Sequence, residues 1–236
     1  MLQKLLDVTM QYIIKMTLHQ VEKLTAEERA IQNNYMSKFQ IKKHETKRPI
    51  IIAMVGLVGS GKTTIANEIA EQIGATVINS DEIRMGLRKQ KTDYKNVRLI
   101  AENMAIKIVE QGGNVILDSD HIDVKDCANI REKAKQAGAK ILFVRTYADP
   151  DIIFGRIITA KANEFFAGAK TSWTGDKQSK SAVVKIRELW RRTPLHYRWE
   201  IAGGGRWVLR KLPYLFANID TGKNYKGVLQ KAFKSL

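Results

Sequence analysis

The fold is decided by the stretch Gly56-Leu57-Val58-Gly59-Ser60-Gly61-Lys62-Thr63-Thr64, which directly follows the apolar run Pro49-Ile50-Ile51-Ile52-Ala53-Met54-Val55. It matches the pattern G-x-x-x-x-G-K-[ST] in the strand–loop–helix setting that this pattern requires. Glycines at positions 56, 59 and 61 let the backbone bend tightly and turn its N–H groups toward an anion. A glycine-rich turn without a ligand is the alternative, but the strand, the spacing, the lysine and the threonine all favour a phosphate-binding loop.

Two side chains of this stretch predict its ligand. Lys62 stands where an ammonium reaches the β- and γ-phosphates of a nucleotide, and Thr63 stands where a hydroxyl reaches Mg²⁺ between them. The helix that opens at Lys62 also points its free N–H groups and positive dipole end at the same anion. The sequence therefore predicts a nucleoside triphosphate, ATP, and Mg²⁺ as ligands of residues 56–64.

Length and composition predict one main domain. The chain has 236 residues, 44% of them hydrophobic, which suffices for one substantial α/β core with appendages. The single cysteine, Cys127, allows no internal disulfide, and the four histidines show no metal-ligand spacing. The N-terminal stretch is interrupted by Lys4, Asp7 and Lys15, and no apolar run reaches the ~20 residues of a membrane span. We therefore expect a soluble, cytoplasmic protein.

The chain is strongly basic. Its 40 Lys and Arg against 24 Asp and Glu give a net charge of +16, which attracts nucleic acid, nucleotides or an acidic membrane surface. A merely solubilising surface charge is the alternative, because no zinc finger or RRM signature accompanies the charge. Charge alone names no substrate.

From residue 50 onward, short β-branched runs alternate with helical patterns, which is typical of a parallel sheet covered by helices. The expected fold is α/β, with three layers and a five-stranded, mainly parallel sheet. The expected strands are 50–55, 76–79, 114–118, 140–146 and 215–219. The expected helices are 62–73, 82–88, 94–111, 124–137, 150–161, 183–193 and 224–234.

Residues 1–48 form a predicted helical N-terminal extension to a main domain at 49–236. Residues 2–24 show an amphipathic stripe, and Thr25 with Glu28 forms a capping-box pattern that opens a second helix running to about Phe39. A polar segment at 42–49 serves as the linker. The extension is either an arm that grips a partner or substrate, or a helical hairpin packed on the core.

Two further segments interrupt the alternation. Residues 162–182 lack periodicity, and such a long irregular segment inside a compact domain predicts a lid. Gly203 to Gly205 mark a flexible turn before the strand-like segment 206–209.

Asp81 and Arg84 follow the second expected strand. Because ligands of an open parallel sheet bind at the carboxyl ends of its strands, these side chains are expected near the phosphates. Asp81 would accept a proton from an attacking hydroxyl, and Arg84 would neutralise a phosphoryl group or hold an anionic substrate. The alternative is that Ser80 or Asp81 merely caps the next helix.

These motifs together resemble a family. The loop at 56–64, followed by Ser80-Asp81-Glu82-Ile83-Arg84 at the end of the second strand, resembles the P-loop kinase group that includes polynucleotide 5′-hydroxyl kinases, zeta toxins, chloramphenicol phosphotransferases and adenylylsulfate kinases, with an AAA_33-like ATP-binding domain. The resemblance implies that Lys62, Asp81 and Arg84 are catalytic, with Asp81 as the general base. It implies ATP-dependent transfer to a hydroxyl, either the 5′-hydroxyl of a nucleic acid or that of a sugar nucleotide.

The same resemblance extends to later segments. Asp118 resembles the second acidic strand end, which holds Mg²⁺ together with Thr63 or binds substrate, whereas Asp120 is interpreted as a cap of the next helix. Arg156 resembles the start of the lid. Ala160 stands where many members have another arginine, so the lid cation stays open among the following basic residues: Lys161, Lys170, Arg187, Arg191 and Arg192.

Residues 185–199 interleave basic and aromatic side chains, which predicts either a polynucleotide channel or an amphipathic helix with Ile186, Leu189 and Trp190 in the core. Other classes of nucleotide-binding protein fit less well. A GTPase switch would have glycine where His121 stands, and a mechanical ATPase would have glutamate where Ser119 stands. The remaining alternative is a non-catalytic, ATP-dependent nucleic-acid-binding protein.

Overall fold

A computed structural model describes residues 24–44, 46–161, 172, 174–234 and 236. Its strands are β1 Ile50–Val55, β2 Ala75–Asn79, β3 Asn114–Asp118, β4 Lys140–Tyr147, β5 Tyr197–Glu200, β6 Arg206–Leu209 and β7 Ala217–Asp220. Its helices are α2 Ala26–Met36, α3 Lys62–Ile73, α4 Ser80–Lys89, α5 Val97–Glu110, α6 Val124–Gln136, α7 Pro150–Thr159, α8 Lys177–His196 and α9 Lys226–Phe233. Within these described ranges, no helix is long and apolar enough to cross a membrane.

The main sheet has five strands in the order β2-β3-β1-β4-β7, and every neighbouring pair is parallel. β1 lies at the centre, where Ile52 pairs with Ile116 of β3 on one side and with Leu142 of β4 on the other. All six residues of β1 are buried, as expected for a parallel strand with both faces covered. The prediction of a parallel α/β sheet is confirmed.

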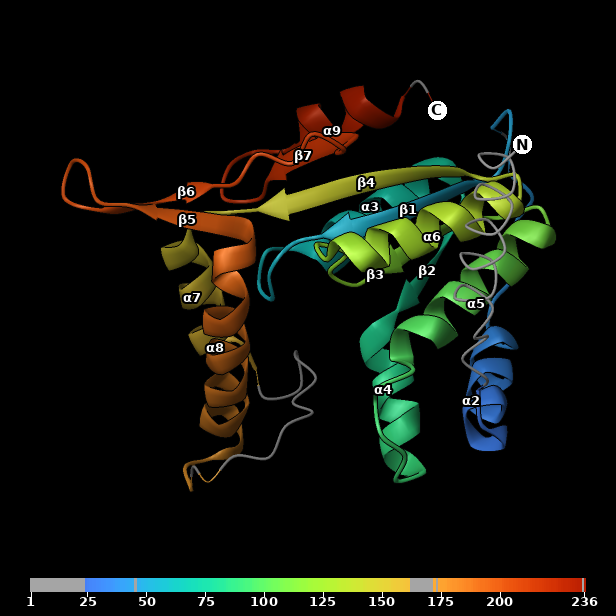
Figure 1. The fold of residues 1–236 in the computed structure, drawn as a ribbon, viewed down its shortest axis with the longest axis horizontal. Helices are drawn as coiled ribbons and strands as arrows, with labels where there is room; N and C mark the ends of the chain where they lie inside the picture. Colours follow the sequence, from blue (N-terminus) through green and yellow to red (C-terminus); the bar gives the residue numbers. More distant parts are fainter. Residues whose placement is uncertain (1–23, 45, 162–171, 173, 235) are drawn as a thin grey trace, which may run out of the picture.

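Helices cover both faces of this sheet (Figure 1). On one face, α3 and α9 contribute Ile65, Ile69 and Leu229 to a core with alternate residues of β1 and β4. On the other face, α5 and α6 contribute residues such as Ile108 and Ile130 to the larger core. The three layers place the carboxyl ends of β1, β2 and β3 along one edge, where the phosphate-binding loop begins.

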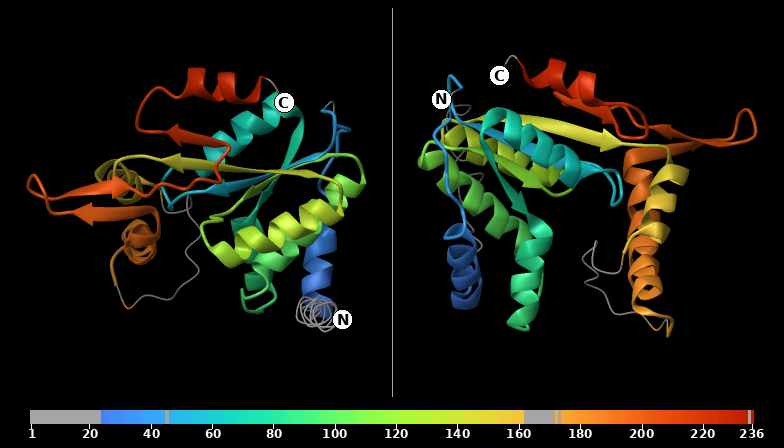
Figure 2. Two further views of the ribbon diagram at one scale, coloured as in Figure 1. Left: turned by 45° about the horizontal axis from the view of Figure 1, so that its top comes forward. Right: turned by 180° about the vertical axis from the view of Figure 1, so that it is seen from behind.

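Two groups of helices project from this edge. Figures 1 and 2 show α4 beside α2 on one side and α7 beside α8 on the other. α8 is anchored by Leu189 and by the adjacent Tyr197, which pack with Leu57 of the loop and with Ile153 and Ile157 of α7. α4 on one side and α7 with α8 on the other therefore form opposite walls above the loop.

Two segments differ from the expectation. β5 and β6 pair in a second, two-stranded antiparallel sheet. Of these two strands, only the one at 206–209 was predicted. The predicted lid at 162–182 falls mostly on 162–171 and 173, which lie outside the described residues. Its last part, from Lys177, is helical rather than irregular, because Asp176 caps α8 by accepting a hydrogen bond from the Ser179 N–H.

The described part of the N-terminal extension packs on the core. Ile31 and Tyr35 of α2 join the larger hydrophobic cluster, and the buried Glu28 accepts hydrogen bonds from the Asn96 amide. The predicted capping box is present, with Thr25 and Glu28 bonding each other's backbone N–H groups. α2 therefore packs on the core. The predicted helix at 2–24 lies outside the described residues, so the hairpin stays a prediction.

The Thr25→Ala change removes the side-chain cap of α2. We expect it to lower the free energy of unfolding by about 1 kcal/mol, because one backbone N–H loses its acceptor. Urea unfolding measures this loss, with Thr174→Ala in an exposed segment as the control, for which a change within about 0.5 kcal/mol is expected. Equal midpoints for both variants would contradict the cap.

Candidate active site

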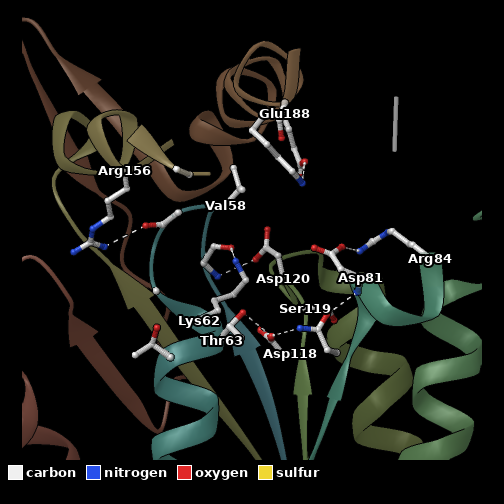
Figure 3. A pocket seen from close by; sticks show the side chains of 18 of the residues that line it. Val58, Lys62, Thr63, Asp81, Arg84, Asp118, Ser119, Asp120, Arg156 and Glu188 are labelled. Atoms are coloured by element: carbon white, nitrogen blue, oxygen red, sulfur yellow. Dashed lines mark hydrogen bonds and ion pairs between the residues drawn. The ribbon is translucent and has the colours of Figure 1, made fainter. Parts of the chain in front are cut away.

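A cleft of about 1480 Å³ lies between the phosphate-binding loop, α4, the β3–α6 loop, α8 and the β7–α9 turn. Figure 3 shows its lining from close by. Pockets for one small ligand usually measure about 300–1,000 Å³. The cleft is therefore large enough for two substrates side by side.

The backbone of the loop needs its glycines. Gly56, Gly59 and Gly61 have φ angles of 153°, 77° and 84°. A Cβ at Gly56 would lie 2.6 Å from both the Ser60 hydroxyl oxygen and the Thr146 carbonyl oxygen, so no side chain fits there. α3 begins directly after Gly61 without a side-chain cap, which leaves its first N–H groups available to an anion.

Lys62 and Thr63 lie at the floor of the cleft (Figure 3). The Lys62 ammonium donates to the carbonyl oxygens of Gly56 and Leu57, each at 2.8 Å, so its charge lies over the loop. The Thr63 hydroxyl donates to the Asp118 carboxylate at 2.8 Å, and the Asn79 amide donates to the same oxygen at 3.2 Å. The ends of β1, β2 and β3 thus bring these side chains together.

The pair of Thr63 and Asp118 fits a magnesium ion. Burial raises the pKa of Asp118, and the charge of Asp81 adds to this, while the Lys62 charge and the Thr63 hydrogen bond act in the opposite direction. A cation placed beside a buried carboxylate would restore its preference for the charged form. No group of three or more His, Cys, Asp or Glu that could hold a metal occurs among the described residues, and Mg²⁺ characteristically combines one or two protein oxygens with phosphate and water.

Asp81 and Arg84 lie at the α4 wall. Asn79 caps α4 by accepting a hydrogen bond from the Asp81 N–H, so the interpretation that Ser80 or Asp81 is the cap is wrong. The Asp81 carboxylate instead accepts a hydrogen bond from the Arg84 guanidinium at 2.6 Å, and both side chains remain more than a third exposed. Both residues line the cleft, and Figure 3 shows them on the opposite side of the loop from Arg156.

Asp120 does not cap α6, contrary to the expectation, because Asp123 occupies the cap position. Its carboxylate accepts hydrogen bonds from the Gly56 N–H at 3.0 Å, from the Arg192 guanidinium at 2.5 and 2.9 Å, and from His196 at 3.1 Å. Burial alone would raise the pKa of Asp120, but His196 and Arg192 outweigh it and hold the pKa well below its usual range. Asp120 therefore ties the phosphate-binding loop to α8.

The candidate lid cations lie in different parts of the structure, and only some of them line the cleft. The Arg156 guanidinium donates to the carbonyl oxygens of Gly59 and Thr221 and to the Thr221 hydroxyl, so it joins the loop to the β7–α9 turn. Arg191 and Arg192 of α8 line the cleft, whereas Arg187 and Lys161 do not. Lys170 lies outside the described residues. Lys185, from the predicted segment 185–199, also lines the cleft, as do four basic residues that the sequence patterns did not single out: Arg88, Arg98, Lys177 and Lys180.

The segment 185–199 agrees in part with the predicted amphipathic helix, because residues 185–196 are helical and Ile186 and Leu189 pack in the hydrophobic cluster with α7. Leu189 is buried, but the Trp190 side chain is 81% exposed, so the placement of Trp190 in the core is wrong. The helix ends at His196, and Tyr197 begins a strand. Arg191 and Arg192 line the cleft, so this part of α8 faces it.

Comparison with known families identifies the domain. Residues 51–172, just over half of the chain, match the AAA_33 family, described as an AAA domain. The chain belongs to the AAA_33 family of P-loop kinase domains. The family match spans the loop, Asp81, Arg84 and Asp118, so the predicted resemblance is confirmed, while the role of each residue stays a prediction.

Two curated proteins resemble parts of this AAA_33 chain. An adenylyl-sulfate kinase of Buchnera aphidicola is 30% identical over 131 residues, which cover 51% of this chain and 61% of that protein. An adenylyl-sulfate kinase of Bacillus licheniformis is 42% identical over 76 residues, which cover 28% of this chain and 38% of that protein. This chain thus aligns with less than two thirds of either relative.

A protein of known crystal structure from Chloroflexus aurantiacus shares the fold. It aligns with a TM-score of 0.54 and 16% identity, over 80% of this chain and 100% of that protein. At this identity the likeness supports the P-loop kinase-like α/β architecture and nothing finer.

Proposed function

We propose that this AAA_33 protein is an ATP-dependent kinase that transfers the γ-phosphoryl group to a hydroxyl of a small anionic acceptor. One observation carries the proposal. Asp81, a carboxylate able to accept a proton, lines the same cleft as Lys62, Thr63 and Asp118. The proposed phosphate-binding half and acceptor half of the site would therefore share one cleft.

The nucleotide half consists of the loop and its neighbours. The backbone N–H groups of residues 56–64 and the Lys62 ammonium would hold the β- and γ-phosphates. Thr63 and Asp118 would hold Mg²⁺, which neutralises phosphate charge when bound. Arg156, Thr221 and Tyr225 line the end of the cleft where the rest of the nucleotide would lie.

The acceptor half faces these phosphates from α4. Asp81 would take the proton of the acceptor hydroxyl while that oxygen bonds to the γ-phosphorus and the bond to the ADP oxygen breaks. Arg84 holds Asp81 through their ion pair and would also bind an anionic group of the acceptor. Lys62 would stabilise the charge on the phosphoryl group during transfer.

Charge supports an anionic acceptor. Arg84 and Arg98 on the α4 and α5 side line the cleft, and basic residues of α8 face them. The two curated relatives are named adenylyl-sulfate kinases, which favours a small molecule over a polynucleotide. A sugar nucleotide and a 5′-hydroxyl oligonucleotide remain separate arms of the test.

The test incubates the purified protein with γ-labelled ATP, Mg²⁺ and a panel of adenosine 5′-phosphosulfate, UDP-sugars and 5′-hydroxyl oligonucleotides. We expect transfer to at least one acceptor, and a loss of about 100-fold or more in Lys62→Ala, because a charge-stabilising group is removed. Lys125→Ala, at an exposed site of α6, serves as the matched control and should retain transfer. Transfer to no acceptor, or equal transfer by Lys62→Ala, would contradict the proposal.

A further inference from the structure

The inner face of α8 carries a row of three polar residues one turn apart. Lys177, Ser181 and Lys185 are separated by four residues each, which places them on one side of a helix, and all three line the cleft. Figure 1 shows α8 running away from the sheet, so the row extends from the loop toward the far end of the cleft. The nucleotide half described above does not use these residues.

The row contains two buried polar side chains, and one of them lacks a hydrogen-bond partner. Ser181 is only 7% exposed, and its hydroxyl has no hydrogen-bond partner. A buried hydroxyl without a partner is costly, which makes it a receptive donor for a ligand oxygen. Lys185 is 5% exposed and pairs with Glu188 at 3.1 Å, which takes one of the three donors of its ammonium.

Lys177, at the N-terminal end of the row, adds a third donor. Lys177 lines the cleft, is exposed, and forms no ion pair with any residue in the part of the chain that the structure describes. Two ammonium groups and a hydroxyl thus follow one another along the same wall of the cleft, and among the described residues only Lys185 of the three has an acidic partner, Glu188. Phosphate and sulfate oxygens are the natural partners of such a set.

The position of the row sets the length of its ligand. Arg192 marks the level of the loop on α8, because it bonds Asp120, which bonds Gly56. Lys185 and Ser181 precede Arg192 by seven and eleven residues, which is about 10 and 16 Å along a helix that rises 1.5 Å per residue. An anionic group held there is remote from the γ-phosphate and belongs to the far end of an extended molecule.

We propose that Lys177, Ser181 and Lys185 form a second anion site, which binds a phosphate or sulfate group of the acceptor remote from the hydroxyl that is phosphorylated. This inference rests on the proposed kinase function and narrows its substrate class to acceptors at least as long as a nucleotide. Monosaccharides and other small uncharged acceptors cannot reach both Asp81 and this row.

The test measures equilibrium binding by calorimetry in the presence of Mg²⁺ and a non-hydrolysable ATP analogue, so it does not depend on turnover. Three matched pairs of probes are used: adenosine 5′-phosphosulfate with adenosine, UDP-N-acetylglucosamine with N-acetylglucosamine, and a 5′-hydroxyl dinucleotide with its nucleoside. We expect at least one charged probe to bind about tenfold or more tightly than its neutral partner. The pair that shows the difference identifies the source of the anionic group.

The variants are Lys177→Gln with Ser181→Ala, which avoids disturbing the buried Lys185, and Arg187→Gln as the matched control. Arg187 carries the same charge on the same helix but does not line the cleft. We expect the double variant to weaken the charged probe about tenfold while the affinity for the ATP analogue stays unchanged, and the control to bind as the wild type does. Thermal unfolding checks that each variant is folded.

Two results would overturn the second anion site. One is that every charged probe binds the wild type no better than its neutral partner, and the other is that the double variant binds the charged probe as tightly as the wild type. Either result leaves the kinase function standing if phosphoryl transfer occurs. If no acceptor of the panel is phosphorylated, the proposed kinase function is wrong, whatever the binding measurements show.

Discussion

Asp81→Asn is expected to lower kcat by about 10²- to 10⁴-fold, the usual contribution of a positioned general base. The amide has the shape of the carboxylate but cannot take the proton of the acceptor hydroxyl. The KM for ATP should change little, because Asp81 lies on the α4 wall and its hydrogen bonds join it to Asn79 and Arg84, which lie outside the phosphate-binding loop. Steady-state kinetics with varied ATP and varied acceptor separate the two effects.

The matched control for this change is Asp93→Asn, which removes an exposed carboxylate outside the cleft. Its kcat should equal that of the wild type. A kcat for Asp81→Asn within about threefold of the wild type would contradict the role of Asp81 as the base. In that case its ion pair with Arg84 would have only a positioning effect.

Asp120→Asn is expected to lower the free energy of unfolding by about 3–5 kcal/mol, because it leaves the charge of Arg192 largely buried without its strong partner. The Asp120 side chain is 14% exposed and that of Arg192 is 22% exposed. ATP binding should weaken as well, since Asp120 accepts a hydrogen bond from the Gly56 N–H at the start of the loop. Urea unfolding and calorimetric titration with ATP measure the two losses.

Asp123→Asn provides a matched control, because Asp123 approaches the same Arg192 at 3.4 Å but is 46% exposed. An exposed pair of this kind contributes at most about 1 kcal/mol. Equal losses for the two variants would contradict a special role for Asp120.

The effect of Asp120→Asn should also depend on pH. The pKa of Asp120 is lowered in the folded state, so its stabilisation is fully present above the unfolded pKa of about 3.9 and is lost as the pH falls through the lower folded value. The difference in unfolding free energy between wild type and variant should shrink as the pH falls below about 4. A difference that grows toward low pH would contradict the assignment.

The loop and the sheet could be predicted because their signals are local. Residues 50–64 combine a buried strand, glycines at fixed spacing and a helix start within fifteen positions, and the resulting loop and helix agree with the prediction. The positions of Asp81 and Asp118 in the site could also be predicted from the sequence, since each residue follows or ends a strand whose carboxyl end must face the ligand.

The α8 side of the cleft could not be predicted in this way. Asp120 contacts Arg192 and His196, which follow it by 72 and 76 residues, and no pattern within one segment reveals such a pairing. The exposure of Trp190 and the inward position of Lys185 depend on which face of α8 packs against α7, and the helical period alone leaves that face open. The β5–β6 hairpin likewise depends on pairing across its turn.

The most direct test of the central claim measures products from one reaction mixture of ATP, Mg²⁺, the protein and the best acceptor of the panel. Mass spectrometry quantifies the phosphorylated acceptor and ADP together. The account predicts one phosphorylated acceptor for each ADP formed, with Lys62→Ala and Asp81→Asn producing little of either. ADP formed with free phosphate at the same rate whether or not an acceptor is present would contradict it.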